Sequence, residues 1–185
     1  TFKPYGASSK MIYPCYGLAE GTLFVAGSKV GHEPVVKNFD KKALVQNKVI
    51  EKQSNENCST LVSSGHYVGD QVVKIVNPET KIEMKNGELG EVWVHGQSIA
   101  RGYWNKPDVS EKIFGAHIAG TNEGPFLRTE DLGFFTGSEL FITGRIKDLI
   151  IIRGVNHYPQ DIERTIEICH PSLRQGGGAA FSIEL

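Results

Sequence analysis

From residue 66 onward the chain is dominated by short runs in which apolar and polar residues alternate, separated by turns. Four segments are strand candidates because they alternate in this way or are continuously apolar: residues 71–76, 91–95, 140–143 and 149–152. Gly69-Asp70 and Asn86-Gly87 supply turn residues before the first two. Because successive side chains of a strand point to opposite faces, the pattern predicts antiparallel sheet or a small barrel.

The first part of the chain predicts a strand, a loop and a strand. Residues 11–13 and 22–25 are apolar and β-prone, and a polar turn containing Gly17 and Glu20 separates them. Loops held by a rigid scaffold often carry binding and catalytic groups. We therefore look for chemistry between these two runs.

Residues 27–65 are polar and weakly patterned, which indicates an exposed insertion instead of core. One short helix is expected from Asp40, whose carboxylate can accept hydrogen bonds from the free N–H groups of a first turn. Phe39 and Leu44 fall at the two hydrophobic-staple positions of that helix. Residues 55–64 are expected to form a loop.

After Gly154 the apolar period becomes helical, which predicts a domain boundary near residue 150. Pro159 suits the first helical position, and Pro171 ends the helix. One stripe at helical spacing comprises Ile162, Thr165, Ile166 and Cys169. A buried strand is expected at 179–185. The chain is therefore of mixed α+β class, rich in antiparallel strands.

Charge and cysteine content exclude several classes of function. Twenty Lys and Arg against twenty-one Asp and Glu leave a formal net charge of −1, which gives no electrostatic footprint for nucleic acid. No apolar run reaches the ~20 residues that span a bilayer. Three distant cysteines in no metal spacing favour a reducing compartment, hence the cytoplasm. The chain begins at Thr1 without a signal peptide and ends inside an expected strand, so we expect an internal fragment.

The turn at 16–20 carries the first candidate chemistry. Glu20 is a hard oxygen ligand of the kind that Mg²⁺ takes beside water and phosphate, and Tyr16 offers a flat face to a base. The alternatives are a solvated turn glutamate and a half-buried core tyrosine, which are commoner.

Two further polar turns follow. Asp131 at a strand end can accept hydrogen bonds from the vicinal hydroxyls of a ribose, or it can cap its own turn. Arg145 and Lys147 can neutralise phosphate or grip a ribose, or they are edge-strand charges that block aggregation. Asp148 falls at the predicted boundary, where a hinge residue is expected. Neither glycine-rich nucleotide fingerprint occurs, and the histidines show no metal spacing.

Five motifs occur in an order that resembles the adenylate-forming, AMP-binding superfamily. They are Tyr-Gly-Leu-Ala-Glu at 16–20, Gly-Glu-Leu-Gly-Glu-Val-Trp-Val at 87–94, Ala-Arg-Gly-Tyr-Trp-Asn-Lys-Pro at 100–107, Arg-Thr-Glu-Asp-Leu at 128–132 and Gly-Arg-Ile-Lys-Asp at 144–148. The chain most resembles the fatty-acyl-AMP ligases, because Thr-Leu-Phe-Val follows at 22–25 and Asn-His-Tyr-Pro-Gln-Asp-Ile-Glu at 156–163. The polar stretch at about 35–60 falls where these ligases carry an insertion that acyl-CoA ligases lack.

The resemblance implies a fold and a reaction. Residues 1–147 would be the distal part of a large AMP-binding domain with a barrel-like subdomain, and 148–185 the beginning of a small α+β lid domain. The enzyme would activate a fatty acid with ATP, giving acyl-adenylate and pyrophosphate. It would then pass the acyl group to the phosphopantetheine thiol of an acyl carrier protein, in lipid metabolism or polyketide or lipopeptide biosynthesis. The insertion would restrain the lid and disfavour transfer to CoA.

The resemblance also implies residue roles. Tyr16 would stack on adenine with Gly17 in the same turn, and Glu20 would hold Mg²⁺. Asp131 and Arg145 would bind the ribose of ATP or AMP. The remaining two are the hinge, Asp148, and the lid loop, Gly154. The catalytic lysine of the lid is expected downstream of this chain and the phosphate loop upstream, so the chain alone is expected to be inactive.

One position departs from the family pattern. The ribose-binding turn usually reads Thr-Gly-Asp, whereas Glu130 stands here in place of the glycine. If that place needs a positive φ, Glu130 costs about 1 kcal/mol or more and tilts Asp131. Three alternatives therefore stand beside the first reading: an acyl-CoA ligase, an amino-acid adenylation domain, and a non-catalytic module that docks a carrier.

Overall fold

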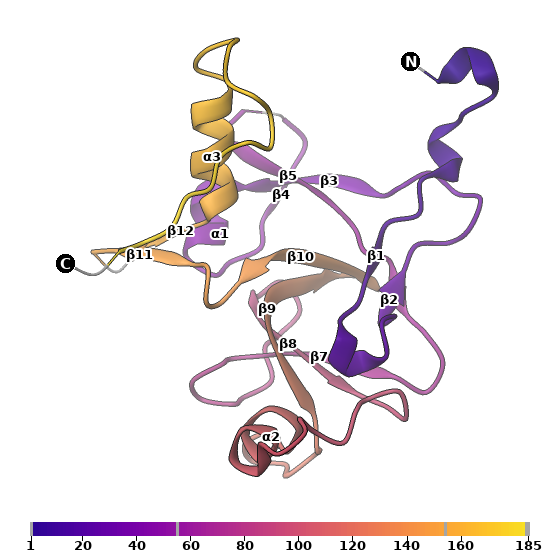
Figure 1. Ribbon diagram of the computed structural model, residues 1–185, viewed down its shortest axis with the longest axis vertical. Helices are drawn as coiled ribbons and strands as arrows, with labels where there is room; N and C mark the ends of the chain where they lie inside the picture. The colour runs from indigo at the N-terminus through magenta and orange to yellow at the C-terminus, as the bar shows by residue number, and fades with distance from the viewer. Residues whose placement is uncertain (1, 55, 154, 184–185) are drawn as a thin grey trace.

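The computed structural model describes residues 2–54, 56–153 and 155–183. It has the expected mixed α+β fold, and its largest sheet is antiparallel throughout. The strands of this central sheet are β7 (Val72–Val76), β8 (Gly90–His95), β9 (Leu127–Thr136) and β10 (Glu139–Arg145). Their order is β10-β9-β8-β7, so chain neighbours are also sheet neighbours (Figure 1).

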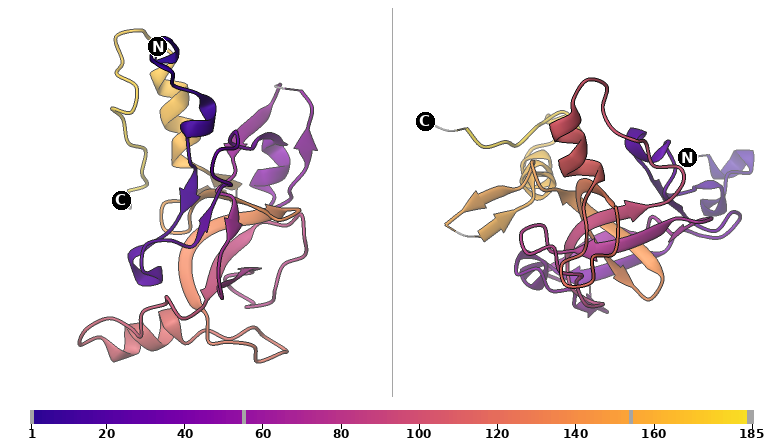
Figure 2. Two further views of the ribbon diagram at one scale, coloured as in Figure 1. Left: turned by 90° about the vertical axis from the view of Figure 1, so that its right-hand side faces the viewer. Right: turned by 90° about the horizontal axis from the view of Figure 1, so that it is seen from below.

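Within the described ranges, three smaller sheets and several helices surround the central sheet. The strands are β1 (Cys15–Tyr16), β2 (Ala26–Gly27) and β6 (His66–Tyr67); β3 (Val36–Asp40), β4 (Glu51–Lys52) and β5 (Cys58–Val62); β11 (Ile150–Ile152) and β12 (Val155–His157). The helices are α1 (Lys41–Val45), α2 (Pro107–Phe114) and α3 (Pro159–Glu167), with 3-10 turns η1 (Lys3–Tyr5), η2 (Ser9–Met11) and η3 (Ala19–Gly21). The α2 and α3 helices lie at opposite ends of the molecule, as Figure 1 and the left view of Figure 2 show. No helix in the described part of the chain is long and apolar enough to cross a membrane.

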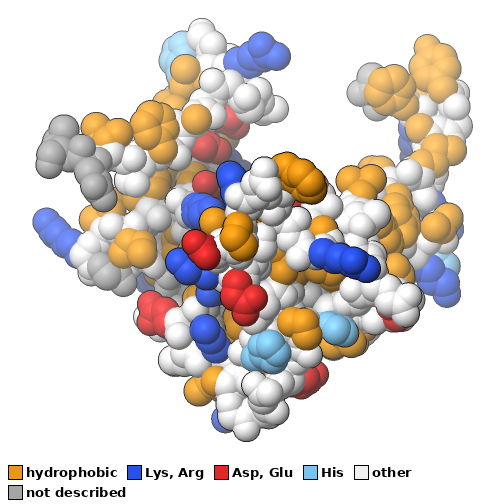
Figure 3. Space-filling model, turned by 60° about the horizontal axis from the view of Figure 1, so that its bottom comes forward, with side chains coloured by type: hydrophobic (Ala, Val, Ile, Leu, Met, Phe, Trp, Pro, Cys, Tyr) orange, Lys and Arg blue, Asp and Glu red, His pale blue; other side chains and the backbone are white. Residues whose placement is uncertain are grey.

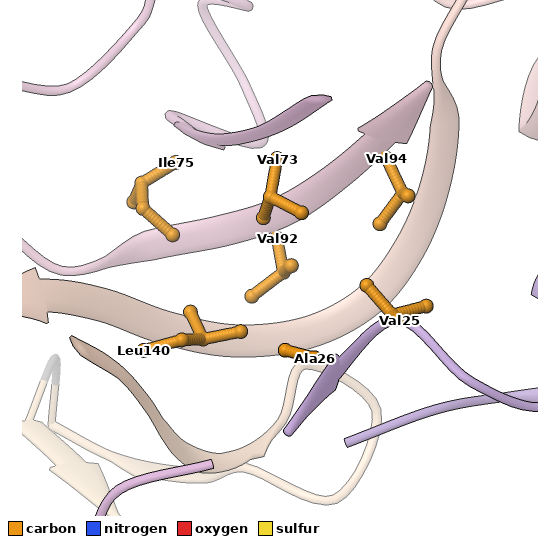
Figure 4. Close-up of a cluster of buried hydrophobic side chains, with 7 residues drawn as sticks. All are labelled: Val25, Ala26, Val73, Ile75, Val92, Val94 and Leu140. Carbon is orange, nitrogen blue, oxygen red and sulfur yellow. The ribbon is translucent and has the colours of Figure 1, made fainter. Parts of the chain in front are cut away.

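Both faces of the central sheet are buried, which confirms the alternation expected at 71–76 and 91–95. One face carries a cluster that Figure 4 shows: Val25, Ala26, Val73, Ile75, Val92, Val94 and Leu140. Trp93 points to the other face, where its fully buried ring lies 6.3 Å from that of Phe126. Because Val25 and Ala26 are fully buried in the first cluster, β2 is fixed against the sheet, and the loop that precedes it is held nearby.

The segment 27–65 is more ordered and more buried than its composition indicates. The expected helix is present as α1, and its N-cap Asp40 accepts a hydrogen bond from the Ala43 amide at 2.8 Å. The expectation of an exposed insertion is wrong in part, because Phe39 is fully buried and Leu44 is 3% exposed in one cluster. The loop expected at 55–64 is also wrong, since β5 pairs there with β3.

The first strand pair lies four residues away from its expected place. The structure pairs β1 with β2, whereas residues 11–13 and 22–25 were expected. Met11 ends the turn η2, and Thr22 and Leu23 have φ values of 54° and 78°, which no strand accommodates. The loop between the strands, with Gly17 and Glu20, is as expected.

The C-terminal part confirms one expectation and contradicts another. The α3 helix begins at Pro159 as expected, but its stripe faces outward, with Ile166 53% exposed. The strand expected at 179–185 is wrong for 179–183, which form no strand. The α2 helix and the strand β9 were not expected.

The shape of the molecule leaves its two ends apart. The N-terminal segment projects on the side opposite to α3, and the face in Figure 3 is hollowed between two arms. Acidic and basic side chains are interspersed on that face. Phe2, Tyr5 and Met11 are each more than 70% exposed, so the N-terminal segment adds little to the core.

Replacing Phe39 tests whether the inserted segment belongs to the core. Its ring lies 4.9 Å and 5.2 Å from those of Phe134 and Phe141, in edge-on contact. We expect Phe39→Ala to lower the free energy of unfolding by about 3–5 kcal/mol, through lost burial and the cavity left behind. Denaturant unfolding measures the change, with Val36→Ala as control because Val36 is 55% exposed on the same strand. Equal effects of the two substitutions would contradict this placement.

Candidate functional site

The Asp131 carboxylate lies between two side chains that are distant in the sequence. Its Oδ2 accepts a hydrogen bond from the Tyr16 hydroxyl at 2.7 Å, and its Oδ1 accepts one from Nε of Arg145 at 2.9 Å. Asp131 and Arg145 are paired residues of β9 and β10, while Tyr16 ends β1. The structure thus brings together three of the expected nucleotide-binding residues. The carboxylate is directed at these side chains and not at the backbone of its own turn.

The two partners hold Asp131 in its charged form. Burial and the charge of Asp131 raise the pKa of Tyr16, so the phenol stays protonated and donates to the carboxylate. The hydrogen bond and charge of Asp131 also raise the pKa of Arg145. The Arg145 side chain is 63% exposed and that of Asp131 only 7%. A fixed acceptor and a solvent-facing cation therefore stand side by side.

Tyr16 combines the two roles that its sequence context left open. Its half-buried ring packs against the apolar cluster of Figure 4, as a core tyrosine does. Its hydroxyl is nevertheless committed to Asp131. Gly17 follows immediately, and a Cβ added there would lie 1.5 Å from the carbonyl oxygen of Leu23. Only glycine allows the backbone to pass this closely.

Glu130 adopts the left-handed conformation that its position was expected to require, with φ of 60°. Its carboxylate lies 2.6 Å from Nζ of Lys147, and its carbonyl accepts from the Ile146 amide at 2.8 Å. Glu130 and Asp131 therefore point to different partners, so their charges do not crowd one turn. The turn is strained at this residue but well bonded.

Glu20 lies in η3, four residues after Tyr16. Its Oε1 accepts from the Tyr103 hydroxyl at 2.6 Å, and its carbonyl accepts from the Ala100 amide at 2.8 Å. The hydrogen bond to Glu20, partial burial and the charges of Glu20 and Glu130 raise the pKa of Tyr103 to about 12. One tyrosine thus senses carboxylates from both turns, which indicates that the Glu20 turn lies near the Glu130–Asp131 turn.

The donor set around Glu20 fits Mg²⁺ in one respect. Among the described residues, no three His, Cys, Asp or Glu side chains are grouped to hold a metal ion. Mg²⁺, however, commonly takes one or two carboxylates and fills its remaining positions with water and phosphate oxygens. A single half-buried glutamate is consistent with that mode.

The remaining expected residues lie at the end of β10. Arg145 is the last residue of that strand, which is an edge strand, so the aggregation-blocking alternative also fits its position. Asp148 is exposed in the turn between β10 and β11. Gly154, the expected lid-loop residue, lies outside the described residues.

Glu91 and Tyr103 are the residues near the site whose roles the sequence reasoning missed. Glu91 is fully buried and forms an ion pair with Arg128, whose Nη2 lies 2.8 Å from Oε2. A glutamate inside the apolar run at 91–95 was the available signal, because a buried charge requires a partner. No local signal in the sequence links Tyr103 to Glu20, because 83 residues separate them.

The left-handed backbone of Glu130 gives a stability prediction. Glu130→Gly and Glu130→Ala both remove the ion pair with Lys147, but only glycine adopts positive φ without a steric penalty. We expect the glycine variant to be more stable than the alanine variant by about 1 kcal/mol in denaturant unfolding. Equal stability of the two would show that the turn carries no strain.

Comparison with known proteins bears on this geometry. The sequence model of the AMP-binding enzyme family matches residues 2–104. JamA of Moorena producens, a medium-chain-fatty-acid–[acyl-carrier-protein] ligase, is 47% identical over 100% of this chain and 32% of its own length. FadD28 of Mycobacterium tuberculosis, a long-chain-fatty-acid–AMP ligase, is 43% identical over 98% of this chain and 31% of its own.

Solved structures agree with the sequence relatives. One from studies of fatty acyl-adenylate ligases of E. coli and L. pneumophila has a TM-score of 0.84 at 34% identity, over 97% of this chain and 31% of that chain. The fatty acid AMP ligase from Legionella pneumophila has a TM-score of 0.74 at 42% identity, over 100% and 32%. The chain therefore spans about a third of the length of these relatives. By sequence and by fold, this chain belongs to the AMP-binding enzyme family.

Proposed function

We propose that this chain contributes the nucleoside-binding site of an enzyme that activates a fatty acid with ATP, giving acyl-adenylate and pyrophosphate. The observation that carries the proposal is the Asp131 carboxylate, buried and oriented by Tyr16 and Arg145. Relatives named as fatty-acid–AMP and acyl-carrier-protein ligases support it. An L. pneumophila fatty acyl-adenylate ligase in complex with acyl adenylate and pyrophosphate supports it as well.

The chemistry of the reaction explains why a rigid acceptor is useful. A fatty carboxylate must approach the α-phosphate of ATP, so two anions meet and positioning dominates the rate. Asp131 would accept hydrogen bonds from the ribose hydroxyls, and Arg145 would hold the same sugar from the exposed side. Tyr16 would present its ring to the adenine. Mg²⁺ at Glu20 would neutralise phosphate charge.

The later step, transfer of the acyl group, is proposed to use the thiol of an acyl carrier protein. Residues 1–147 would then belong to a large domain, and 148–185 to a lid that turns about Asp148, with Gly154 facing the carrier thiol. Asp148 is exposed between two strands, which leaves its backbone room to rotate. JamA, named as an acyl-carrier-protein ligase, supports the choice of acceptor.

The inserted segment would favour the carrier over CoA by restraining the lid. Lys41 of α1 carries the contact that supports this proposal, because its Nζ lies 3.0 Å from Oδ2 of Asp161 in α3. Deleting residues 35–60 is a poor test, since Phe39 belongs to the core. A point substitution at Lys41 is sharper.

We expect Lys41→Ala to raise acyl transfer to CoA about two- to fivefold in the full-length protein, the range that an exposed ion pair allows. Hydroxamate-free detection of acyl-CoA by chromatography measures it, and Lys42→Ala is the matched control on the same helix. The same rate of CoA transfer in both variants would contradict the restraint.

The main prediction concerns Asp131. We expect Asp131→Ala in the full-length protein to slow fatty-acid-dependent pyrophosphate release by about 10²-fold or more, because the nucleoside loses its positioning contact. Asp131→Asn keeps the side-chain volume and separates lost charge from lost shape. Asp108→Ala, at an exposed position of α2, is the control. Unchanged pyrophosphate release in folded Asp131→Ala would overturn the proposed function.

A further inference from the structure

Asp131 lies in a bulge of the central sheet. In the pairing of β8 with β9, Glu91 faces Leu132 and Trp93 faces Arg128. The β8 strand thus advances by two residues where β9 advances by four, so residues 129–131 lie opposite the single residue Val92. A bulge bends its strand and re-aims side chains, and bulges are common beside active sites. This one directs the Asp131 carboxylate to Tyr16 and Arg145.

The bulge removes backbone groups from the ladder, and side chains take over as their partners. The Glu130 amide donates to Oε1 of Glu91 at 3.1 Å. The Asp131 amide donates to Oγ1 of Thr129 at 3.1 Å, and that hydroxyl donates to the Val92 carbonyl at 2.7 Å. Two side chains, Glu91 and Thr129, therefore fix the conformation of residues 129–131.

Glu91 is itself held rigidly. It is fully buried, and its Oε2 accepts from Nη2 and Nε of Arg128 at 2.8 Å and 3.1 Å. Arg128 in turn lies over the Trp93 ring, 5.5 Å from the centroid, and donates to the Pro78 carbonyl at 3.3 Å. A buried carboxylate with this many charged and neutral donors has one orientation, and the Glu130 amide is one of those donors.

We propose that Glu91 is a positioning residue for nucleotide use: through the Glu130 amide it sets the bulge that aims Asp131 at the ribose. The inference rests on the proposed function, because it assigns Asp131 to the sugar. Glu91 touches neither the substrate nor Asp131 itself. Its effect is transmitted through one strained residue, Glu130, whose φ of 60° it helps to fix.

The test compares ATP with 3′-deoxyATP in the full-length protein. The readout is the ratio of kcat/KM for the two nucleotides, which reports recognition of the ribose hydroxyl and is insensitive to a general loss of active enzyme. We expect Glu91→Ala to lower kcat/KM for ATP at least about tenfold and to lower the ratio at least about threefold. The KM for the fatty acid should stay unchanged, since the bulge faces the nucleoside.

Conservative and control variants isolate the cause. Glu91→Gln keeps an oxygen that can accept from the Glu130 amide, so its ratio should lie between those of wild type and Glu91→Ala. Glu83→Gln weakens an exposed ion pair with Lys74 at the edge of the same sheet and should leave the ratio unchanged. If Glu91→Ala does not fold, Glu91→Gln decides: a reduced ratio supports the proposal, and a wild-type ratio overturns it.

Asp131→Ala separates failure of this inference from failure of the proposed function. If that variant keeps the wild-type ratio, Asp131 does not recognise the ribose and the proposed function fails. If Asp131→Ala brings the ratio toward one while folded Glu91 variants keep the wild-type ratio, only the role of Glu91 is wrong. A reduced ratio in both sets confirms the chain of contacts from Glu91 to the sugar.

Discussion

A carboxylate removed from water must be matched by donors, and the buried carboxylate of Asp131 makes this demand on three strands at once. Tyr16 in β1 and Arg145 in β10 meet it. Apolar packing makes the meeting feasible, because Val25 and Ala26 fix β2, and with it the Gly17–Glu20 loop, against the central sheet. The polar site is therefore positioned by the core beneath it, and the order of sheet strands determines which loops share its rim.

Backbone strain is concentrated around this carboxylate. Glu130 lies directly before it, and Thr22 and Leu23 follow the Glu20 turn, all three with positive φ. Each such residue costs of order 1–3 kcal/mol and persists only where its surroundings determine it. For Glu130 those surroundings are the Glu91 carboxylate, the Ile146 amide and Lys147. The sequence change from glycine at this place is thus accommodated by contacts instead of by a different backbone.

What the sequence revealed depended on how local the cause was. The alternation in β7 and β8 and the Asp40 cap are set by neighbours in the chain, and both were predicted. The burial of Phe39 was not, because it depends on Phe134 and Phe141, about a hundred residues away. The strand β9 was taken for a turn because its polar bulge interrupts the alternation, and the same bulge hides the partner of Glu91. Asp131 and Arg145 were found through motif order, and only the coordinates join them to Tyr16.

The proposed hinge at Asp148 must act against a shared core. Tyr158, ten residues beyond it, is 9% exposed in one cluster with Phe39, Leu44 and Phe141. Its ring packs so closely over Gly144 that a Cβ there would lie 3.2 Å from Cδ1. Rotation at Asp148 that carries α3 away would expose this ring to water, a cost of about 1.5–3 kcal/mol for a large side chain. Free turning of the segment 148–185 is therefore opposed by apolar burial as well as by the exposed Lys41–Asp161 pair, and the burial is the larger of the two.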